Sequence, residues 1–250
     1  MHPSYTALPD SLRDWALRQP VFFVASAPLR GRHVNLSPKG LPESSLAVLS
    51  PSQVAYVDST GSGCETISHI RENGRVTLLF CSFDKVPRTL RLYCTGTVVE
   101  FDEAEYEDWL ERMGGKNLVA ARAVIVLHVF KVQLSCGFGV PLLALDPDPT
   151  LLDPKPCLQT RSRLQEYAQY TIDRGQLRGY QMKNNFESLD GLPGMHSALR
   201  DSGRSIWWAE CKNWHSRNQH RLQLVQYGIV GLFAILILQT WPSDRHTPKV

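Results

Sequence analysis

The stretch that decides the fold runs from Val76 to Val99 and reads VTLLFCSFDKVPRTLRLYCTGTVV. Its first six residues form a mostly apolar run, which is typical of a fully buried strand. From Arg88 onward apolar and polar side chains alternate, as they do in a strand that buries one face. The face expected to be buried carries Leu90, Leu92, Cys94 and Val98. The stretch therefore predicts two strands separated by a short turn.

Similar short strands are expected on both sides of this pair. Residues 21–25 and 33–37 flank a turn and predict a hairpin, and residues 54–58 predict a third strand. A long apolar run at residues 123–132 predicts the last one. About six closely spaced strands, joined mostly by short turns, favour a closed or partly closed barrel over a doubly wound parallel sheet. We therefore expect a mainly β fold with peripheral helices, of the α+β class.

Two helices inserted between the strands have marked beginnings. Ser62 and Glu65 match a capping box, with Ser62 as the N-cap, and Gly74 supplies a left-handed C-cap for that helix. Asp102 and Glu105 match a second capping box. Both helices are expected to pack an apolar stripe against the strands.

Composition limits the kind of protein this can be. The 250 residues are 43% hydrophobic and 20% charged, which is enough for one full-sized core with a small appendage. The net charge of +3 comes from 27 basic and 24 acidic residues, a balance that gives no reason to expect a nucleic-acid partner. Six cysteines without a C-x-x-C pair, and histidines without ligand spacing, predict no metal site and a reducing compartment. The beginning of the chain does not resemble a secretory signal.

The sequence divides into four segments. Residues 10–145 carry the predicted strands and form the main body. Residues 146–194 begin with a proline-rich linker, at 146–156, and continue into a helical part. Residues 195–221 are a polar connector, and residues 222–241 are an apolar helix.

The apolar helix has two interpretations. Residues 222–241 contain no charged residue and just reach membrane length, and Lys212, Arg217 and Arg221 precede them. A tail anchor of this kind would hold a cytoplasmic body on an intracellular membrane. Three glutamines, however, shorten the purely apolar part to twelve residues, about 18 Å of helix. That length fits a helix buried in the protein or packed on a partner, so both interpretations stay open.

The sharpest local feature is a loop of hydroxyl residues and glycines between a strand and a helix. Free N–H groups at the start of a helix favour a phosphate, glycines allow close approach, and hydroxyls donate hydrogen bonds. The candidate loop residues are Ser59, Thr60, Gly61, Ser62, Gly63 and Thr66. Lys39, Arg88 and Arg91, at or near strand ends, are candidates to complete an anion site. The alternative is that the loop only caps the helix and the cations are surface charges.

A nucleophilic cysteine is the weaker possibility. Cys64 lies one turn from His69, but its position on the apolar side of the predicted helix favours the core. No residue is therefore assigned a catalytic role.

Several motifs resemble a known family. In order along the chain they are FFVASAP at 22–28, HVNLSPKG at 33–40, TGSGCETISH at 60–69, SCGFGVP at 135–141 and SLDGLPG at 188–194. The chain resembles the pyridoxamine 5'-phosphate oxidase-like family of FMN-binding split barrels, over about residues 10–194. Residues 195–250 lie outside the resemblance.

The resemblance implies a six-stranded antiparallel split barrel that forms a homodimer and binds FMN at the subunit interface. Lys39 matches the lysine that closes the family's second strand, and Arg88 matches the arginine that opens the R-x-x-R strand containing Arg91. Residues 59–66 match the phosphate loop. The candidates chosen above are thus the cofactor-binding residues that the resemblance implies.

Two departures separate this chain from the vitamin-making enzymes. Where those enzymes carry S-R-K-G-R-E, residues 61–66 read GSGCET, so the Arg-Lys phosphate clamp is missing. The R-L-x-D-R motif that recognises the substrate phosphate is also missing after residue 150. The sequence therefore predicts an FMN-binding flavoprotein that acts as an oxidoreductase on another small substrate. The alternative is a non-catalytic flavin- or haem-binding or dimerisation module of the same fold, with or without a membrane tether.

Overall fold

The computed structural model describes residues 3–116, 118, 120–145, 156–159, 163–188, 190–191 and 193–240. The chain forms two compact units, Met1–Glu166 and Tyr167–Val250. Helix α5 (Arg163–Asp173) contains the division between them. The first unit contains the sheet and the candidate site.

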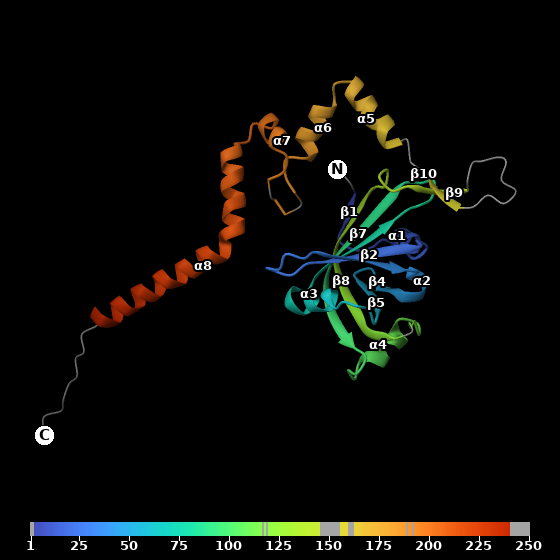
Figure 1. The fold of residues 1–250 in the computed structure, drawn as a ribbon, viewed down its shortest axis with the longest axis horizontal. Helices are drawn as coiled ribbons and strands as arrows, with labels where there is room; N and C mark the ends of the chain where they lie inside the picture. The colour runs from blue at the N-terminus through green and yellow to red at the C-terminus, as the bar shows by residue number, and fades with distance from the viewer. Residues whose placement is uncertain are drawn as a thin grey trace. The chain divides into compact units, whose positions relative to one another are not determined.

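The first unit is built on a curled antiparallel sheet, a half-barrel (Figure 1). Its strands are β1 (Ser4–Tyr5), β2 (Val21–Ser26), β3 (Asn35–Gly40), β4 (Leu46–Ser50), β5 (Gln53–Ser59), β6 (Arg75–Cys81), β7 (Arg88–Glu100) and β8 (Ala121–Cys136). They are ordered β3-β2-β6-β7-β8-β5-β4, and β1 also pairs with β8. A separate two-stranded sheet joins β9 (Leu142–Leu145) to β10 (Pro156–Gln159).

The predicted fold class is confirmed. All six predicted strands are present as β2, β3, β5, β6, β7 and β8, and the predicted hairpin pairs β2 with β3 in antiparallel register. β6 and β7 pair from Arg75↔Thr95 to Cys81↔Thr89. Strands β1 and β4 were not expected from the sequence. β4 pairs with β5 and extends the sheet at that end, whereas β1 pairs with the interior strand β8.

The main core fills the concave side of the sheet. The alternating strand β7 buries Leu90, Leu92 and Cys94 there, each 2% exposed or less. Phe22 packs edge-on against Tyr56 with 5.8 Å between ring centroids. A second cluster, in which Tyr106 and Leu110 of α4 pack on Val57, covers the other face of β5. β5 is therefore buried on both sides, which leaves its C-terminal end to carry polar groups.

The helices of the first unit are α1 (Asp10–Leu17), α2 (Pro42–Ser45), α3 (Glu65–Asn73) and α4 (Tyr106–Arg112). Both predicted capping boxes are wrong, because Cys64 and Glu105 are the N-caps and neither makes a side-chain cap bond. Glu65 is the first residue of α3 rather than its third, and its carboxylate lies beside Gly63. The chain before α4 makes turns instead, with the Tyr106 N–H donating to the Glu103 carbonyl at 3.1 Å. The left-handed C-cap at Gly74 is confirmed, with φ 70°.

The second unit is helical. After α5 it contains α6 (Leu177–Asn184), α7 (His196–Asp201) and α8 (Ile206–Thr240). Residues 206–221 of the predicted polar connector belong to the same helix as the apolar segment. The proline-rich linker lies largely outside the described residues, at 146–155, so the four-segment division stays a prediction.

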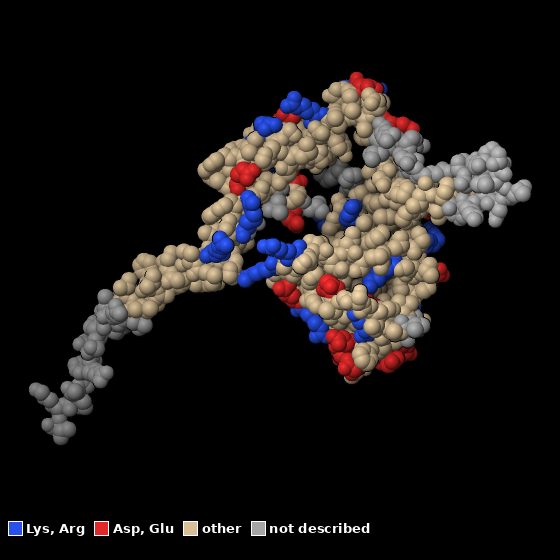
Figure 2. Space-filling view, in the orientation of Figure 1, with Lys and Arg blue, Asp and Glu red and all other residues tan. Residues whose placement is uncertain are grey.

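The predicted C-terminal apolar helix is present as the last part of α8. Residues 217–237 are long and apolar enough, by length and composition, to cross a membrane. The large apolar side chains described between Leu224 and Ile237 are exposed in this chain. Figure 2 shows this part of the helix free of the blue and red that mark charged residues.

Candidate functional site

A polar cavity of about 460 Å³ lies in the first unit, where β3, the end of β5, the start of α3 and the start of β8 meet. It is lined by Asn35, Ser37, Lys39, Asp58, Ser59, Gly61, Ser62, Gly63, Glu65, Thr66 and Arg122. The lining is made of cations, carboxylates, hydroxyls and glycines, which is the chemistry of a polar-ligand site.

Strand β3 contributes one complete face to this cavity. Side chains two residues apart point to the same side of a strand, so Asn35, Ser37 and Lys39 line the cavity together. The residues between them, Leu36 and Pro38, are exposed. β3 is an end strand of the sheet order, which allows this polar face to be accessible.

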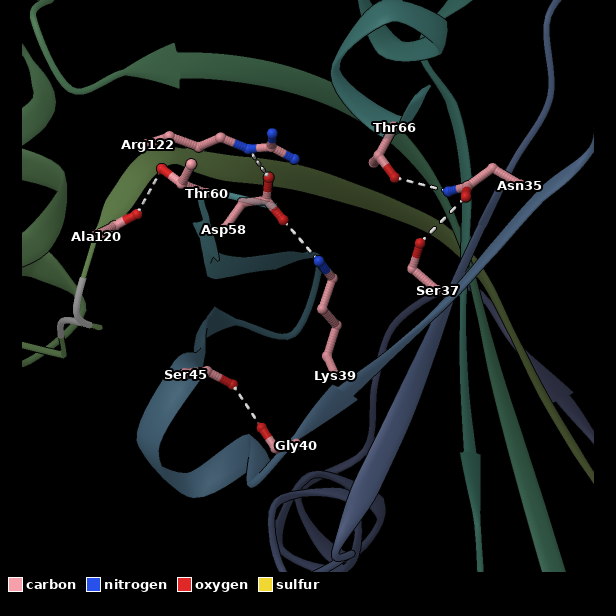
Figure 3. Close-up of polar contacts among 10 residues, drawn as sticks. All are labelled: Asn35, Ser37, Lys39, Gly40, Ser45, Asp58, Thr60, Thr66, Ala120 and Arg122. Atoms are coloured by element: carbon pink, nitrogen blue, oxygen red, sulfur yellow. Dashed lines mark hydrogen bonds and ion pairs between the residues drawn. The ribbon is translucent and has the colours of Figure 1, made fainter. Parts of the chain in front are cut away.

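A buried carboxylate between two cations forms the floor of the site (Figure 3). Asp58 Oδ1 accepts from Lys39 Nζ at 2.7 Å, and Asp58 Oδ2 accepts from Arg122 Nε at 2.8 Å. The Asp58 side chain is 1% exposed, whereas those of Lys39 and Arg122 are 24% and 23% exposed. A buried carboxylate is tolerated when it is paired in this way. Together, Lys39, Arg122 and Asp58 carry a formal charge of +1. The two cations line the cavity.

A second set of contacts connects β3 to the start of α3. Asn35 Nδ2 donates to Thr66 Oγ1 at 2.9 Å, and Ser37 Oγ donates to Asn35 Oδ1 at 3.1 Å (Figure 3). Thr66 is 6% exposed. These bonds fix the first turn of α3, with its free N–H groups, against the polar face of β3.

The loop between β5 and α3 is held from its other side. The Thr60 N–H and hydroxyl both donate to the Ala120 carbonyl, each at 2.8 Å. At Gly61 a side chain would meet open space, whereas at Gly63 it would overlap the Glu65 carboxylate. The backbone at Gly61 is therefore accessible to a ligand that enters the cavity.

Tyr56 lies near Lys39, one of the two cations. Its hydroxyl is buried and has no hydrogen-bond partner among the described residues. Lys39 Nζ lies 5.8 Å from the centroid of its ring. Burial raises the pKa of the Tyr56 phenol well above its ordinary value, the Asp58 charge adds to the rise, and the Arg122 charge opposes it. The phenol therefore stays protonated and can only donate or accept a hydrogen bond.

Six of the nine predicted site residues meet at this cavity: Lys39, Ser59, Gly61, Ser62, Gly63 and Thr66. Thr60 donates to Ala120 instead. Arg88 lies 5.6 Å above the Trp15 ring, and Arg91 pairs with Leu79 and Gln133 within the sheet. Neither arginine lines this cavity. That any of the nine binds a cofactor stays a prediction.

The sequence analysis missed Asn35, Ser37, Asp58, Glu65 and Arg122. Asp58 and Arg122 carried a signal, since each is a charged residue at the end of an apolar strand. That the two residues pair with each other could not be predicted, because 64 residues separate them in the sequence. They meet where β5 pairs with β8, at the register shift between Asp58 and Ser59.

The predicted core position of Cys64 is wrong. Cys64 is exposed, because α3 begins after it and the loop faces solvent. His69 is buried instead, and its Nδ1 lies 2.9 Å from the Ser26 hydroxyl. Among the described residues, no three His, Cys, Asp or Glu side chains cluster as they would around a metal ion.

Two comparisons find known proteins with related sequences. The sequence model of the family described as Pyridoxamine 5'-phosphate oxidase matches residues 8–136. The Pyridoxamine 5'-phosphate oxidase family protein ustO of Aspergillus flavus is 60% identical over 237 residues, which cover 95% of each chain.

Solved structures are more distant. HupZ of Group A Streptococcus is 22% identical, over 50% of this chain and 91% of its own, with a TM-score of 0.40. The FAD binding protein from Mycobacterium smegmatis is 12% identical, over 52% of this chain and 97% of its own, with a TM-score of 0.36.

The family match covers more than half of the chain and contains strands β2 to β8 and the cavity. The Aspergillus flavus relative extends the likeness through nearly the whole sequence. The chain belongs to the pyridoxamine 5'-phosphate oxidase family.

Proposed function

We propose that this protein binds FMN and acts as an oxidoreductase on a small organic substrate. The observation that carries the proposal is the convergence of Lys39, the hydroxyl and glycine loop, and the start of α3 on one cavity. Family membership supports it, because the resemblance of the motifs to FMN-binding split barrels implies this cofactor.

The cavity has the donors that a flavin phosphate needs. Lys39 supplies a positive charge, and Ser59, Ser62 and Thr66 supply hydroxyls. The first turn of α3 supplies free N–H groups, and a helix N-terminus favours an anion. The open space at Gly61 lets the backbone approach the ligand. The residues present therefore fit the phosphate end of FMN.

Bound FMN would supply the redox chemistry, while the chain binds and orients the cofactor. Lys39, Ser59, Thr66 and the glycines are proposed to hold its phosphate. Arg88 and Arg91 lie outside the cavity, so we assign their contacts to the subunit interface of a homodimer.

The competing proposal is a non-catalytic flavin or haem carrier, or a dimerisation module. It is favoured by the buried carboxylate of the cavity, because both Asp58 oxygens already accept from cations and are not available as a base. Reduction of the bound flavin by NADH or NADPH, followed by turnover with an electron acceptor, distinguishes the two. An enzyme completes that cycle, whereas a carrier keeps flavin that no nicotinamide reduces.

The binding step is tested on the purified full-length chain. It is mixed with FMN and desalted, and its visible absorption spectrum is recorded. Retained flavin bands support the proposal. A chain that arrives without flavin and retains none would overturn it.

We also propose that the end of α8 is a tail anchor. Residues 222–240 are 19 uncharged residues of helix, about 28 Å long, close to the thickness of a hydrocarbon core. Lys212, Arg217 and Arg221 precede them on the same helix and favour a cytoplasmic body. An intracellular membrane is the proposed location.

Carbonate extraction of membranes from cells that express the chain tests the anchor. The full chain should remain in the pellet. A variant with Leu232→Lys and Leu236→Lys should be released, because two charges at the centre of the span are costly in lipid. Release of the full chain would leave the alternative, a helix that packs on a partner.

A further inference from the structure

The phosphate loop of this chain has no positive side chain of its own. Residues 59–66 read STGSGCET, without a lysine or arginine. The positive charge at the cavity comes instead from two strands that are distant in sequence, from Lys39 on β3 and Arg122 on β8. Lys39 was expected from the sequence, whereas Arg122 was not.

An irregularity in the sheet places Arg122 at the cavity. β5 pairs with β8 as Asp58↔Ala123 and then Ser59↔Ala121, so Arg122 is the extra residue of a bulge. A bulge changes the direction in which a side chain points. The backbone there is fixed, since the Arg122 carbonyl accepts from the Phe101 N–H at 3.1 Å. The side chain reaches across the end of β5 to Asp58 (Figure 3).

The guanidinium is held in a way that leaves its far end available. Arg122 donates to Asp58 through Nε, at 2.8 Å. Within the described part of the chain, its hydrogen bonding to side chains is confined to Nε, so both terminal nitrogens can donate to a ligand in the cavity. A guanidinium can contact a carboxylate and a phosphate at once because its donors form a rigid planar fork. Asp58 also accepts from Lys39, so one buried carboxylate holds both cations.

The cavity lining has one more charged residue, Glu65, whose negative charge contributes less to the field in the cavity. The Glu65 carboxylate lies against Gly63 at the first residue of α3, where the helix N-terminus favours a negative charge. Glu65 is exposed, so water screens it. Lys39, Arg122 and Asp58 therefore set the local field, with a net charge of +1.

We propose that Arg122 replaces the missing loop cations: together with Lys39 it binds the terminal phosphate of the ligand, and it makes the cavity select phosphorylated flavin over flavin without the phosphate. This rests on the flavin-binding function proposed above. The specificity of the site would thus depend on a residue of β8 that is 56 positions beyond the end of the phosphate loop at Thr66.

The test compares three variants of the full-length chain. Arg122→Gln removes the charge. Arg122→Lys keeps a charge that can pair with Asp58, but its single nitrogen lacks the fork needed to hold Asp58 and a phosphate together. Arg71→Gln is the matched control, because Arg71 also pairs with a carboxylate of another element, Glu100, and lies outside the cavity.

The dissociation constants of FMN and riboflavin are measured for each chain. The wild type and Arg71→Gln should prefer FMN. Arg122→Gln should bind FMN about 10- to 100-fold more weakly, as expected for the loss of a charged hydrogen-bond pair, and riboflavin should bind nearly as before. Arg122→Lys should lose most of the same preference. The proposal would be overturned if Arg122→Gln preferred FMN over riboflavin by the same factor as the wild type does.

A second measurement separates this proposal from the flavin function. The melting temperature is recorded with and without inorganic phosphate. If the wild type binds neither flavin but is stabilised by phosphate, and Arg122→Gln is not, the phosphate role of Arg122 stands and the flavin function is wrong. Equal stabilisation of both chains overturns the role of Arg122. If Arg122→Gln does not fold, Arg122→Lys, which retains the pair with Asp58, decides the outcome.

Discussion

Asp58 is the residue on which the geometry of the cavity depends most. Its carboxylate is buried and neutralised by Lys39 and Arg122 at 2.7 and 2.8 Å. Removing one member of a buried ion pair is costly, because the remaining charges lose their partner in a poorly solvated place. The folding of this region and the anion binding proposed for it therefore depend on the same three side chains.

The first prediction concerns this carboxylate. Asp58→Asn keeps the shape of the side chain but leaves two half-buried cations without a counter-charge. We expect the free energy of unfolding to fall by about 3–5 kcal/mol, measured by urea denaturation. Asp14→Asn is the control, since Asp14 pairs with Arg13 at an exposed site and should cost about 1 kcal/mol or less. Equal losses in the two variants would contradict the role given to burial.

The second prediction concerns Cys94. Burial raises the pKa of its thiol to about 12, from 9.0. Because the thiolate is the reactive form, iodoacetamide at mildly alkaline pH should modify the exposed Cys64 and Cys136 and leave Cys94 intact until the chain unfolds. Peptide mass spectrometry reads the labelled sites. Labelling of Cys94 in the folded chain, at the rate of Cys64, would show that β7 does not bury it.

The raised pKa of Cys94 makes the free energy of unfolding depend on pH. Above pH 9.0 the unfolded chain releases the Cys94 proton, whereas the folded chain keeps it until about pH 12. The contribution of this group is therefore complete below pH 9.0 and is lost as the pH rises toward 12.

At the level of single residues, the sequence was informative where residues that are neighbours along the chain line the cavity. Lys39 and the loop from Ser59 to Thr66 were recognisable because the glycines, hydroxyls and strand ends are adjacent in sequence. Arg122 stood out as a charge at a strand end, but its place at the cavity was not predictable, since that place depends on a bulge in the pairing of β5 with β8. Sequence pattern does not specify where such a bulge falls.

Among the elements, the strands were predictable and the helix beginnings were not. Alternation and apolar runs are repeated over many residues, so β6, β7 and β8 were placed correctly to within a few residues. β4 was missed because Leu46–Ser50 directly follows α2 (Pro42–Ser45), without a turn that would mark its beginning. A capping box needs its second side chain three residues after the N-cap, and here Glu65 directly follows the N-cap Cys64, so the predicted pair is out of position.

The third prediction tests the junction between β7 and β8. Gly137 follows β8, and a Cβ atom there would lie 2.5 Å from the Arg88 backbone nitrogen, closer than atoms approach. Gly137→Ala must therefore displace the start of β7, and we expect a loss of about 2 kcal/mol or more in the free energy of unfolding.

Gly139 is the matched control for this junction. A Cβ atom there meets nothing within 4 Å, so Gly139→Ala should change stability by about 0.5 kcal/mol or less. Both free energies come from urea denaturation. A Gly137→Ala variant as stable as Gly139→Ala would mean that the two strands do not meet as described.

On the scale of the whole molecule, the chain combines a family barrel with a helical second unit. The matched family region ends at Cys136, before the second unit begins. The Aspergillus flavus relative nevertheless covers 95% of the chain, so most of residues 195–250, which lay outside the motif resemblance, are shared with it. The sequence of the helical unit is therefore shared, for the most part, with at least one other protein of the family.

The central claim is that the cavity at Lys39 holds the phosphate of FMN, and a titration tests it directly. The fluorescence of FMN is followed as purified full-length protein is added, for the wild type, for Lys39→Gln and for Lys131→Gln, whose lysine lies on β8 outside the cavity. We predict saturable quenching by the wild type and by Lys131→Gln, and binding about 10- to 100-fold weaker for Lys39→Gln. Unchanged fluorescence with the wild type, or equal affinity in all three chains, would contradict the account.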